Sequence, residues 1–117
     1  MPVIRASEFK DGEVFPGVQR GRLVNSDVGA GHLDMGELLI QPGKAVPMHI
    51  HETHEEAMYI IDGPFEYILG DETGVINTGD AMLAPVGVKH FLKNATAQPK
   101  RLLFIFPTTK INRVLVD

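Results

Sequence analysis

Turn-forming residues recur every few positions between short apolar runs, and this spacing limits the possible folds more than any other feature. Among the 12 glycines and 8 prolines, groups such as Pro42-Gly43 and Gly79-Asp80 preset turn dihedrals or accept a positive φ. An apolar period of about 3.6 residues nowhere persists for about three helical turns, which argues against long amphipathic helices. The sequence therefore predicts an all-β chain, folded as a sandwich or a barrel.

The segments between these turns have the length and apolar content of strands. They cover residues 18–25, 32–41, 48–51, 55–62, 65–69, 75–77, 81–84, 88–93 and 101–106. The length of 117 residues is typical of one domain, and the sequence shows no linker or low-complexity tract. We therefore predict a single domain over residues 1–117.

Charge and composition argue against several classes of partner. The sequence has 11 Lys plus Arg against 15 Asp plus Glu, and this net charge of -4 argues against nucleic-acid binding. Zero cysteines exclude thiolate metal sites and a cysteine nucleophile. No stretch approaches the roughly 18 apolar residues of a membrane span. Charged side chains also precede any apolar run near the start of the sequence, so we expect no membrane contact and a cytoplasmic location.

Histidines gather in two segments that combine a turn with a strand. His49 and His51 alternate along a predicted strand, so their side chains project from the same face. Glu56 lies near the start of the next predicted strand, and His90 follows the turn Pro85-Val86-Gly87. Three imidazole nitrogens and one carboxylate oxygen suit a divalent transition metal, namely Fe, Mn, Ni, Zn, Co or Cu, and do not suit Ca or Mg.

At these positions the sequence resembles the cupin family, whose two signatures are both present. The first signature is filled by Gly43, His49, His51, Glu56 and Gly63, and the second by Gly79, Pro85, Gly87, His90 and Asn94. The two signatures and the spacer between them cover residues 43–94. The resemblance implies a cupin β-barrel, also called a double-stranded β-helix or jelly roll, with two antiparallel sheets and a metal inside. It also implies that His49, His51, Glu56 and His90 bind this metal.

Two neighbours of the expected ligands leave alternatives open. Glu55 competes with Glu56 as the ligand, and the six-residue spacing from Glu56 to Gly63 in the family signature favours Glu56. His54 lies on the turn between the ligand strands. Its functional interpretation is a catalytic proton shuttle at the mouth of the site, and the alternative is a solvated turn residue.

Strand alternation, counted by twos from the ligands, indicates which apolar side chains enter the barrel near the metal. It predicts four of them as walls of a substrate pocket: Met58, Ile60, Leu83 and Leu92. Core packing is the alternative role for Met58 and Ile60. An apolar pocket with a metal favours a small substrate that chelates the metal through two oxygens.

Charged residues outside the two signatures support fewer predictions. Arg20 and Arg22 share one strand face and could hold a substrate carboxylate, and we include Arg22 in the predicted pocket. The alternative is a solvated strand edge, where charge blocks aggregation. His32 and Asp34 have no support from a motif, and we expect them in a loop or on the surface.

Three functions are compatible with these features. The first is a small metal-dependent enzyme, a dioxygenase, isomerase or lyase, that acts on an oxygen-rich small molecule such as an enol, an organic acid or a sugar acid. A metal with four protein ligands keeps coordination positions open for such a substrate. The second is a non-catalytic binding or sensor domain of the same fold. The third is a metal-free structural protein, in which four buried polar side chains would each need another partner.

The C-terminal residues suggest self-association. Residues 110–117 carry four apolar side chains that a barrel of this size has little room to bury. We predict a homodimer in which a terminal segment adds to, or covers, a sheet edge of the partner.

Overall fold

The computed structural model describes residues 2–6 and 10–117, and the chain there is almost entirely β-structure. The strands are β1 (Lys10–Phe15), β2 (Val18–Val24), β3 (Asp34–Ile40), β4 (Ala45–Ile50), β5 (Glu56–Asp62), β6 (Phe65–Leu69), β7 (Glu72–Ile76), β8 (Ala81–Ala84), β9 (His90–Lys93), β10 (Lys100–Phe106) and β11 (Val114–Leu115). A 3-10 turn, η2 (Ser26–Val28), follows β2. The predicted domain includes residues 1 and 7–9, which lie outside the described residues.

Every segment predicted as a strand overlaps an observed one, whereas β1 and β11 were not predicted. Both are edge strands, and neither sequence has the apolar pattern from which a strand is predicted. β1 reads KDGEVF, with charges and a glycine ahead of its apolar residues. β11 has two exposed residues and is held by backbone pairing to β4. Edge strands that carry few apolar residues are common, because they have one neighbour and little buried surface.

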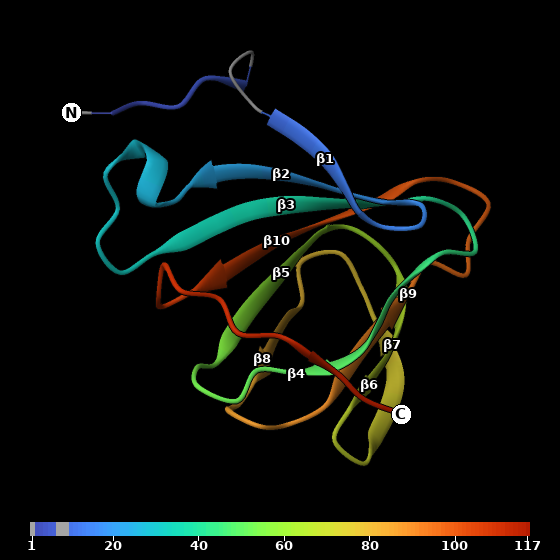
Figure 1. The fold of residues 1–117 in the computed structure, drawn as a ribbon. Coiled ribbons are helices and arrows are strands. Elements are labelled where there is room, and N and C mark those ends of the chain that lie inside the picture. Colours follow the sequence, from blue (N-terminus) through green and yellow to red (C-terminus); the bar gives the residue numbers. More distant parts are fainter. Residues whose placement is uncertain (1, 7–9) are drawn as a thin grey trace.

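The strands form two antiparallel sheets that face each other (Figure 1). One sheet has the order β1-β2-β3-β10-β5-β8, and the other has the order β11-β4-β9-β6-β7. Neighbours in both sheets are joined by long connections as well as hairpins, so strands distant in sequence lie side by side. The predicted all-β barrel of two antiparallel sheets is confirmed.

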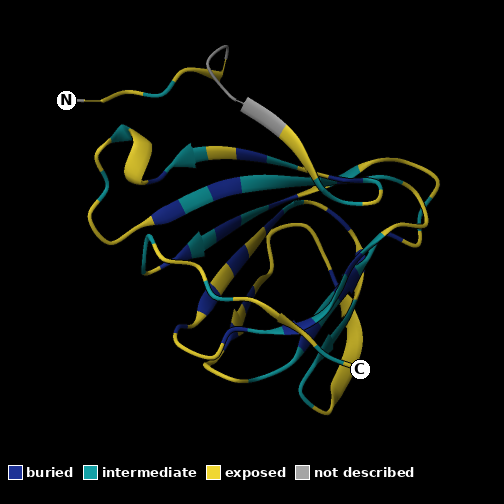
Figure 2. Cartoon of the chain, in the orientation of Figure 1, coloured by how far each residue is buried: buried dark blue, intermediate teal, exposed yellow. Residues whose placement is uncertain are grey.

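Buried and exposed residues alternate along strands of both sheets (Figure 2), and the buried apolar side chains form one core cluster between the sheets. Val18, Ile40, Ile60 and Leu102 are fully buried, and Phe65 enters from the opposite sheet. Alternation of this kind is expected where one face of each strand packs on a core and the other meets solvent. Within the described residues, no helix is long and apolar enough to cross a membrane.

The register between β5 and β8 corrects one predicted pocket residue, Leu83. Met82 pairs directly with Met58, and Ala84 pairs with Glu56. Residues directly opposite each other in a sheet point to the same face, so Met82 and Ala84 enter the barrel. Leu83 points outward and is 53% exposed, so its assignment to the pocket is wrong.

Candidate metal centre and cavity

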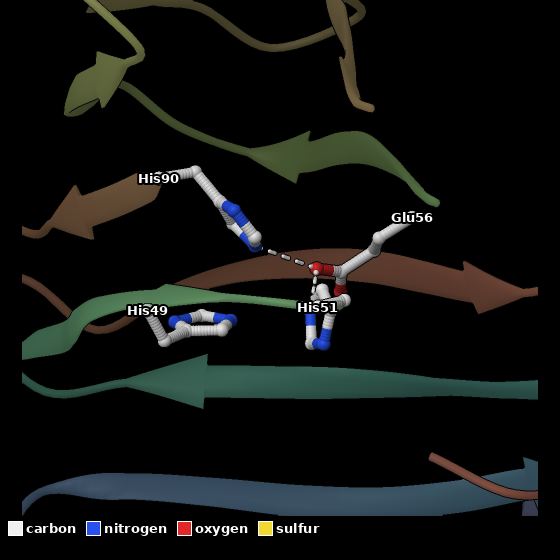
Figure 3. A group of neighbouring side chains, drawn as sticks. All are labelled: His49, His51, Glu56 and His90. Atoms are coloured by element: carbon white, nitrogen blue, oxygen red, sulfur yellow. Dashed lines mark hydrogen bonds and ion pairs between the residues drawn. The ribbon is translucent and has the colours of Figure 1, made fainter. Parts of the chain in front are cut away.

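The two sheets bring together the four side chains that the signatures single out (Figure 3). His49 lies on β4, His51 just follows β4, and His90 begins β9. Glu56 begins β5 in the facing sheet. One ligand atom from each of the four lies within 4.8 Å of every other, and all four residues are buried.

A β-bulge in β4 sets the direction of His49. Val46 pairs with Leu92, but His49 pairs with His90, so three steps along β4 match two steps along β9. Simple alternation would turn residues 46 and 49 to opposite faces. The extra residue at the bulge lets Val46 and His49 both point inward, as their burial shows.

Backbone carbonyls hold all three imidazole rings in place. Nδ1 of His49 donates to the carbonyl oxygen of Pro47 at 2.8 Å, and Nδ1 of His90 donates to that of Val88 at 3.1 Å. Nδ1 of His51 donates to the carbonyl oxygen of Asn112, far along the chain. Because a carbonyl oxygen only accepts, each Nδ1 carries a proton and Nε2 of each neutral ring keeps its lone pair. Metal-binding histidines commonly donate their second ring N–H to a carbonyl or carboxylate oxygen in this way.

Contacts at the centre of the cluster favour a bound cation. Nε2 of His51 lies 3.1 Å from Oε1 of Glu56, and Nε2 of His90 lies 3.0 Å from the same oxygen. Unprotonated nitrogens that face a carboxylate oxygen at these distances need a cation or an extra proton between them. A divalent transition metal would supply that charge, so the donor set fits such an ion.

The pKa values favour the protonation states that ligands need. Burial, with the nearby His90, lowers the pKa of His49 to about 4, so the ring is neutral at pH 7. Burial alone would raise the pKa of Glu56, but with an extra proton on His51 or His90 the hydrogen bonds and positive charge of these rings outweigh it and hold this pKa below its ordinary value. The predicted choice between the two glutamates agrees with the structure, where Glu55 is exposed and Glu56 is buried.

The four side chains open onto a cavity of about 460 Å³ between the sheets. Met58, Leu92 and Arg22 line this cavity, as predicted. Ile60 does not. It is fully buried in the core, and a Cβ added at Gly63 would come within 2.9 Å of its Cγ2. Core packing, the alternative considered for Ile60, is therefore its role, and its assignment to the pocket is wrong.

Sequence reasoning missed two charged residues of the cavity, Asp34 and Arg113. Asp34 was expected in a loop or on the surface, but it begins β3, is 8% exposed and lines the cavity. Arg113 lies beyond both signatures, and its guanidinium carbon stands 4.7 Å from the centre of the Phe15 ring. Neither has a local signal, because pairing of distant segments brings both to the cavity. His32 is exposed, as predicted.

His54 is not the solvated turn residue that was considered, because it is 5% exposed. Its ring stacks on that of His51, with 4.8 Å between centroids. Nδ1 of His54 donates to the carbonyl oxygen of Glu55 at 3.0 Å, and Nε2 accepts from the backbone N–H of Asn112 at 3.0 Å. Both ring nitrogens are thus occupied by the main chain, and His54 is not among the cavity-lining residues. The structure contradicts a proton shuttle here and indicates a supporting role behind His51.

Asn112 joins the C-terminal segment to the loop that carries His51 and His54. Besides its backbone contacts with both rings, its side-chain Oδ1 accepts from the backbone N–H of Glu52 at 2.7 Å. Val114 and Leu115 then pair with Ile50 and His49. No sequence pattern marks Asn112, whose importance depends on a contact about 60 residues away.

Known proteins match this chain over most of its length. The family model described as the cupin domain matches residues 36–106. Protein SchB of Streptomyces halstedii is 33% identical over 85 residues, which are 73% of this chain and 62% of SchB. Polyketide synthase CurC of Streptomyces cyaneus is 26% identical over 102 residues, which are 87% of this chain and 66% of CurC. The chain thus spans less than two thirds of the length of these relatives.

Solved structures share the fold at low sequence identity. The polyketide cyclase RemF from Streptomyces resistomycificus matches 100% of this chain and 86% of its own, with a TM-score of 0.87 and 22% identity. A sugar phosphate isomerase of the cupin superfamily from Silicibacter pomeroyi matches 99% of this chain and 82% of its own, with a TM-score of 0.84 and 19% identity. The family model covers more than half of the sequence, and the two-sheet barrel agrees with it, so the chain belongs to the cupin family.

Proposed function

We propose that this cupin is a metal-dependent enzyme that rearranges a small, oxygen-rich carbonyl compound without net oxidation, by isomerisation or ring closure. The observation that carries the proposal is the buried set of three imidazoles and one carboxylate, which opens onto a cavity of about 460 Å³. A cavity of this size suits a small molecule and excludes polymers. The proposal keeps the enzyme class expected from the sequence and narrows its chemistry.

The ligand shell would hold a metal with open coordination positions. His49, His51 and His90 present nitrogens whose tautomers are held by backbone carbonyls, and Glu56 adds a negative charge. A bound divalent metal would act as a Lewis acid and polarise a substrate carbonyl, which lowers the pKa of the adjacent C–H. Phe104 and Phe106 line the same cavity and reduce the access of water to it.

Asp34 supplies a group that can move a proton. Its carboxyl lines the cavity, and among the described residues it makes no hydrogen bond or ion pair that would occupy its oxygens. Burial raises the pKa of Asp34 above its ordinary value, although Arg22 and Arg20 oppose this. A carboxylate with a raised pKa is a stronger base. In a substrate that extends from the metal ligands to Asp34, this carboxylate would take a proton from the carbon beside the carbonyl and return it to a neighbouring atom, so the step is redox-neutral.

Two of the matched proteins have names that favour rearrangement over oxygenation. RemF is described as a polyketide cyclase and the Silicibacter pomeroyi protein as a sugar phosphate isomerase, and both names denote rearrangements. Dioxygenation and non-catalytic binding are the alternatives that an experiment must separate.

Proton exchange provides a test that needs no knowledge of the product. Metal-loaded protein is incubated in D₂O with a panel of keto acids, ketoses and β-diketones, and deuterium at the carbon beside the carbonyl is followed by NMR. We expect exchange on at least one compound. His90→Ala should lose both metal and exchange, whereas Asp34→Asn should keep the metal and slow exchange by about 10²-fold or more. Oxygen consumption without exchange would indicate a dioxygenase, and binding without either would indicate a sensor domain.

A further inference from the structure

We propose that Arg20, Arg22 and Arg113 form an anion-binding subsite at the end of the cavity away from the metal ligands, so that the substrate carries a carboxylate or phosphate group. This inference deepens the proposed function and depends on it only for the role of the metal. The three arginines come from β2 and from the C-terminal segment, and they line the same cavity as the ligand cluster.

Sheet register places Arg22 at one end of a row of side chains. Arg22 pairs with Gly36, Gly36 with Phe104, and Phe104 with Met58, so the row crosses four strands of one sheet. Three strand spacings separate Arg22 from Met58, which is about 14 Å between their backbones. Glu56 lies two residues from Met58 on β5, so the metal ligands stand near the far end of this row.

Phe104 forms the apolar floor between the two ends. A Cβ added at Gly36 would lie 2.8 Å from Cζ of Phe104, so the glycine is needed for the ring to lie over β3. The ring is 3% exposed and lines the cavity. A substrate that reaches from the arginines to the metal ligands therefore crosses an aromatic surface and needs a flat or apolar middle portion.

The positive charge at this end is not balanced within the described residues. Besides Glu56 of the ligand cluster, Asp34 supplies the only carboxylate among the described residues that line the cavity, and none of the three arginines makes an ion pair with a described carboxylate. Burial lowers the pKa of Arg20, with Arg22 and Arg113 adding to the effect and Asp34 opposing it. Cations held together in a partly buried cavity favour an anionic ligand, which removes their repulsion.

Arg113 is held ready for such a ligand. Its guanidinium lies over Phe15 at 4.7 Å, a cation–π contact that orients the group without neutralising it. The backbone around it is fixed by Asn112 on one side and by Val114, paired with Ile50, on the other. An arginine aimed into a cavity from a tethered segment pays little entropy when it binds an anion.

Together these features predict a substrate with a metal-chelating enol, keto or diol group at one end, an apolar or aromatic body, and an anionic group at the other. 3,4-Dihydroxybenzoate has this arrangement and serves as a probe, and 3,4-dihydroxybenzamide is its neutral match. Calorimetric titrations use protein loaded with Zn(II), which does not change oxidation state. We expect the benzoate to bind at least about tenfold more tightly than the benzamide.

Variants connect this preference to the arginines. Arg22→Gln and Arg113→Gln should each reduce the preference severalfold with unchanged zinc content, and the double variant should abolish it. Both residues are exposed enough that the fold should tolerate the change. Arg101→Gln is the matched control, since Arg101 is exposed and pairs with Glu37 outside this cavity. Asp34→Asn should strengthen binding of the benzoate, because it removes the opposing negative charge.

Metal-free protein separates this inference from the proposed function. Benzoate, phenylphosphonate and benzamide are titrated into protein freed of metal by chelation, and the two anions should still bind more tightly than benzamide. Their order shows whether the subsite prefers a carboxylate or a phosphate group. Failure to bind zinc would refute the metal-dependent function, but the titrations of metal-free protein would still test the anion subsite. Equal binding of anions and amide, or a preference that survives in the double variant, would overturn the anion subsite.

Discussion

The carbonyl oxygen of Asn112 accepts a hydrogen bond from Nδ1 of His51, and this contact ties a metal-ligand candidate to the C-terminal segment. Through this hydrogen bond the C-terminal segment helps to position a metal-ligand candidate. Contacts of this kind set the tautomer and direction of a ligand ring.

Asn112→Ala should weaken metal binding without removing a ligand. The variant loses the side-chain acceptor for the N–H of Glu52, so the loop that carries His51 becomes less well held. We expect about a tenfold loss of metal affinity and a decrease in unfolding free energy of about 1 kcal/mol. Asn112→Asp keeps an acceptor oxygen and should restore most of the affinity. Equal metal affinity in all three proteins, measured by competition with a chromogenic chelator, would contradict this role.

The pKa of His49 predicts acid sensitivity of the metal-free protein. Its folded-state pKa of about 4 lies below the ordinary value of 6.5, so the unfolded chain binds a proton more readily than the folded chain between these values. Stability is therefore full above about pH 6.5 and falls as the pH decreases towards about 4, by up to about 3 kcal/mol. Urea unfolding at a series of pH values measures this. In His49→Gln the free energy of unfolding should depend less strongly on pH between about 4 and 6.5. An unchanged dependence would refute the lowered pKa of His49.

Filling the cavity should impair ligand binding while the metal stays bound. Leu38 lines the cavity from β3 and is not a ligand candidate, so Leu38→Trp adds bulk there. The expected cost in stability is about 1–3 kcal/mol. Binding of 3,4-dihydroxybenzoate should weaken at least about tenfold at unchanged zinc content. Leu83→Trp is the control, because Leu83 is 53% exposed on the outer face of β8. Loss of binding in both variants, or in neither, would place the ligand elsewhere.

Self-association remains a prediction from the sequence. In the single chain, Leu115 pairs through its backbone with His49 and leaves its side chain 59% exposed. We expect light scattering to give about twice the chain mass of 12.8 kDa. If the terminal segment lies in the dimer interface, Leu115→Glu should shift the protein towards the monomer, and Leu83→Glu, an equally exposed change on another face, should not. A wild-type mass near one chain would end the dimer hypothesis.

The sequence by itself was sufficient for the fold class and for the four clustered ligand candidates. Turn residues and alternation are local signals, because a glycine or proline limits its own dihedrals and neighbouring strand residues must point to opposite faces. The predicted ligand positions are therefore found in the folded barrel: His49 and His51 lie two residues apart at the end of β4, and Glu56 and His90 begin strands. Even there the bulge in β4, which turns Val46 and His49 to one face, could not be counted from the sequence.

Tertiary structure alone decided which other side chains meet the cavity. Because of the register between β8 and β5, Leu83 points outward. Ile60 is buried in the core and does not line the cavity. Pairing between distant segments brought Asp34 and Arg113 to the cavity, and contacts with the C-terminal segment enclosed His54. The physical reason is that register, bulges and edge pairing are selected by the total packing of both sheets. A shift of a single residue reverses the face of every side chain in a strand, and a local pattern carries no information about that choice.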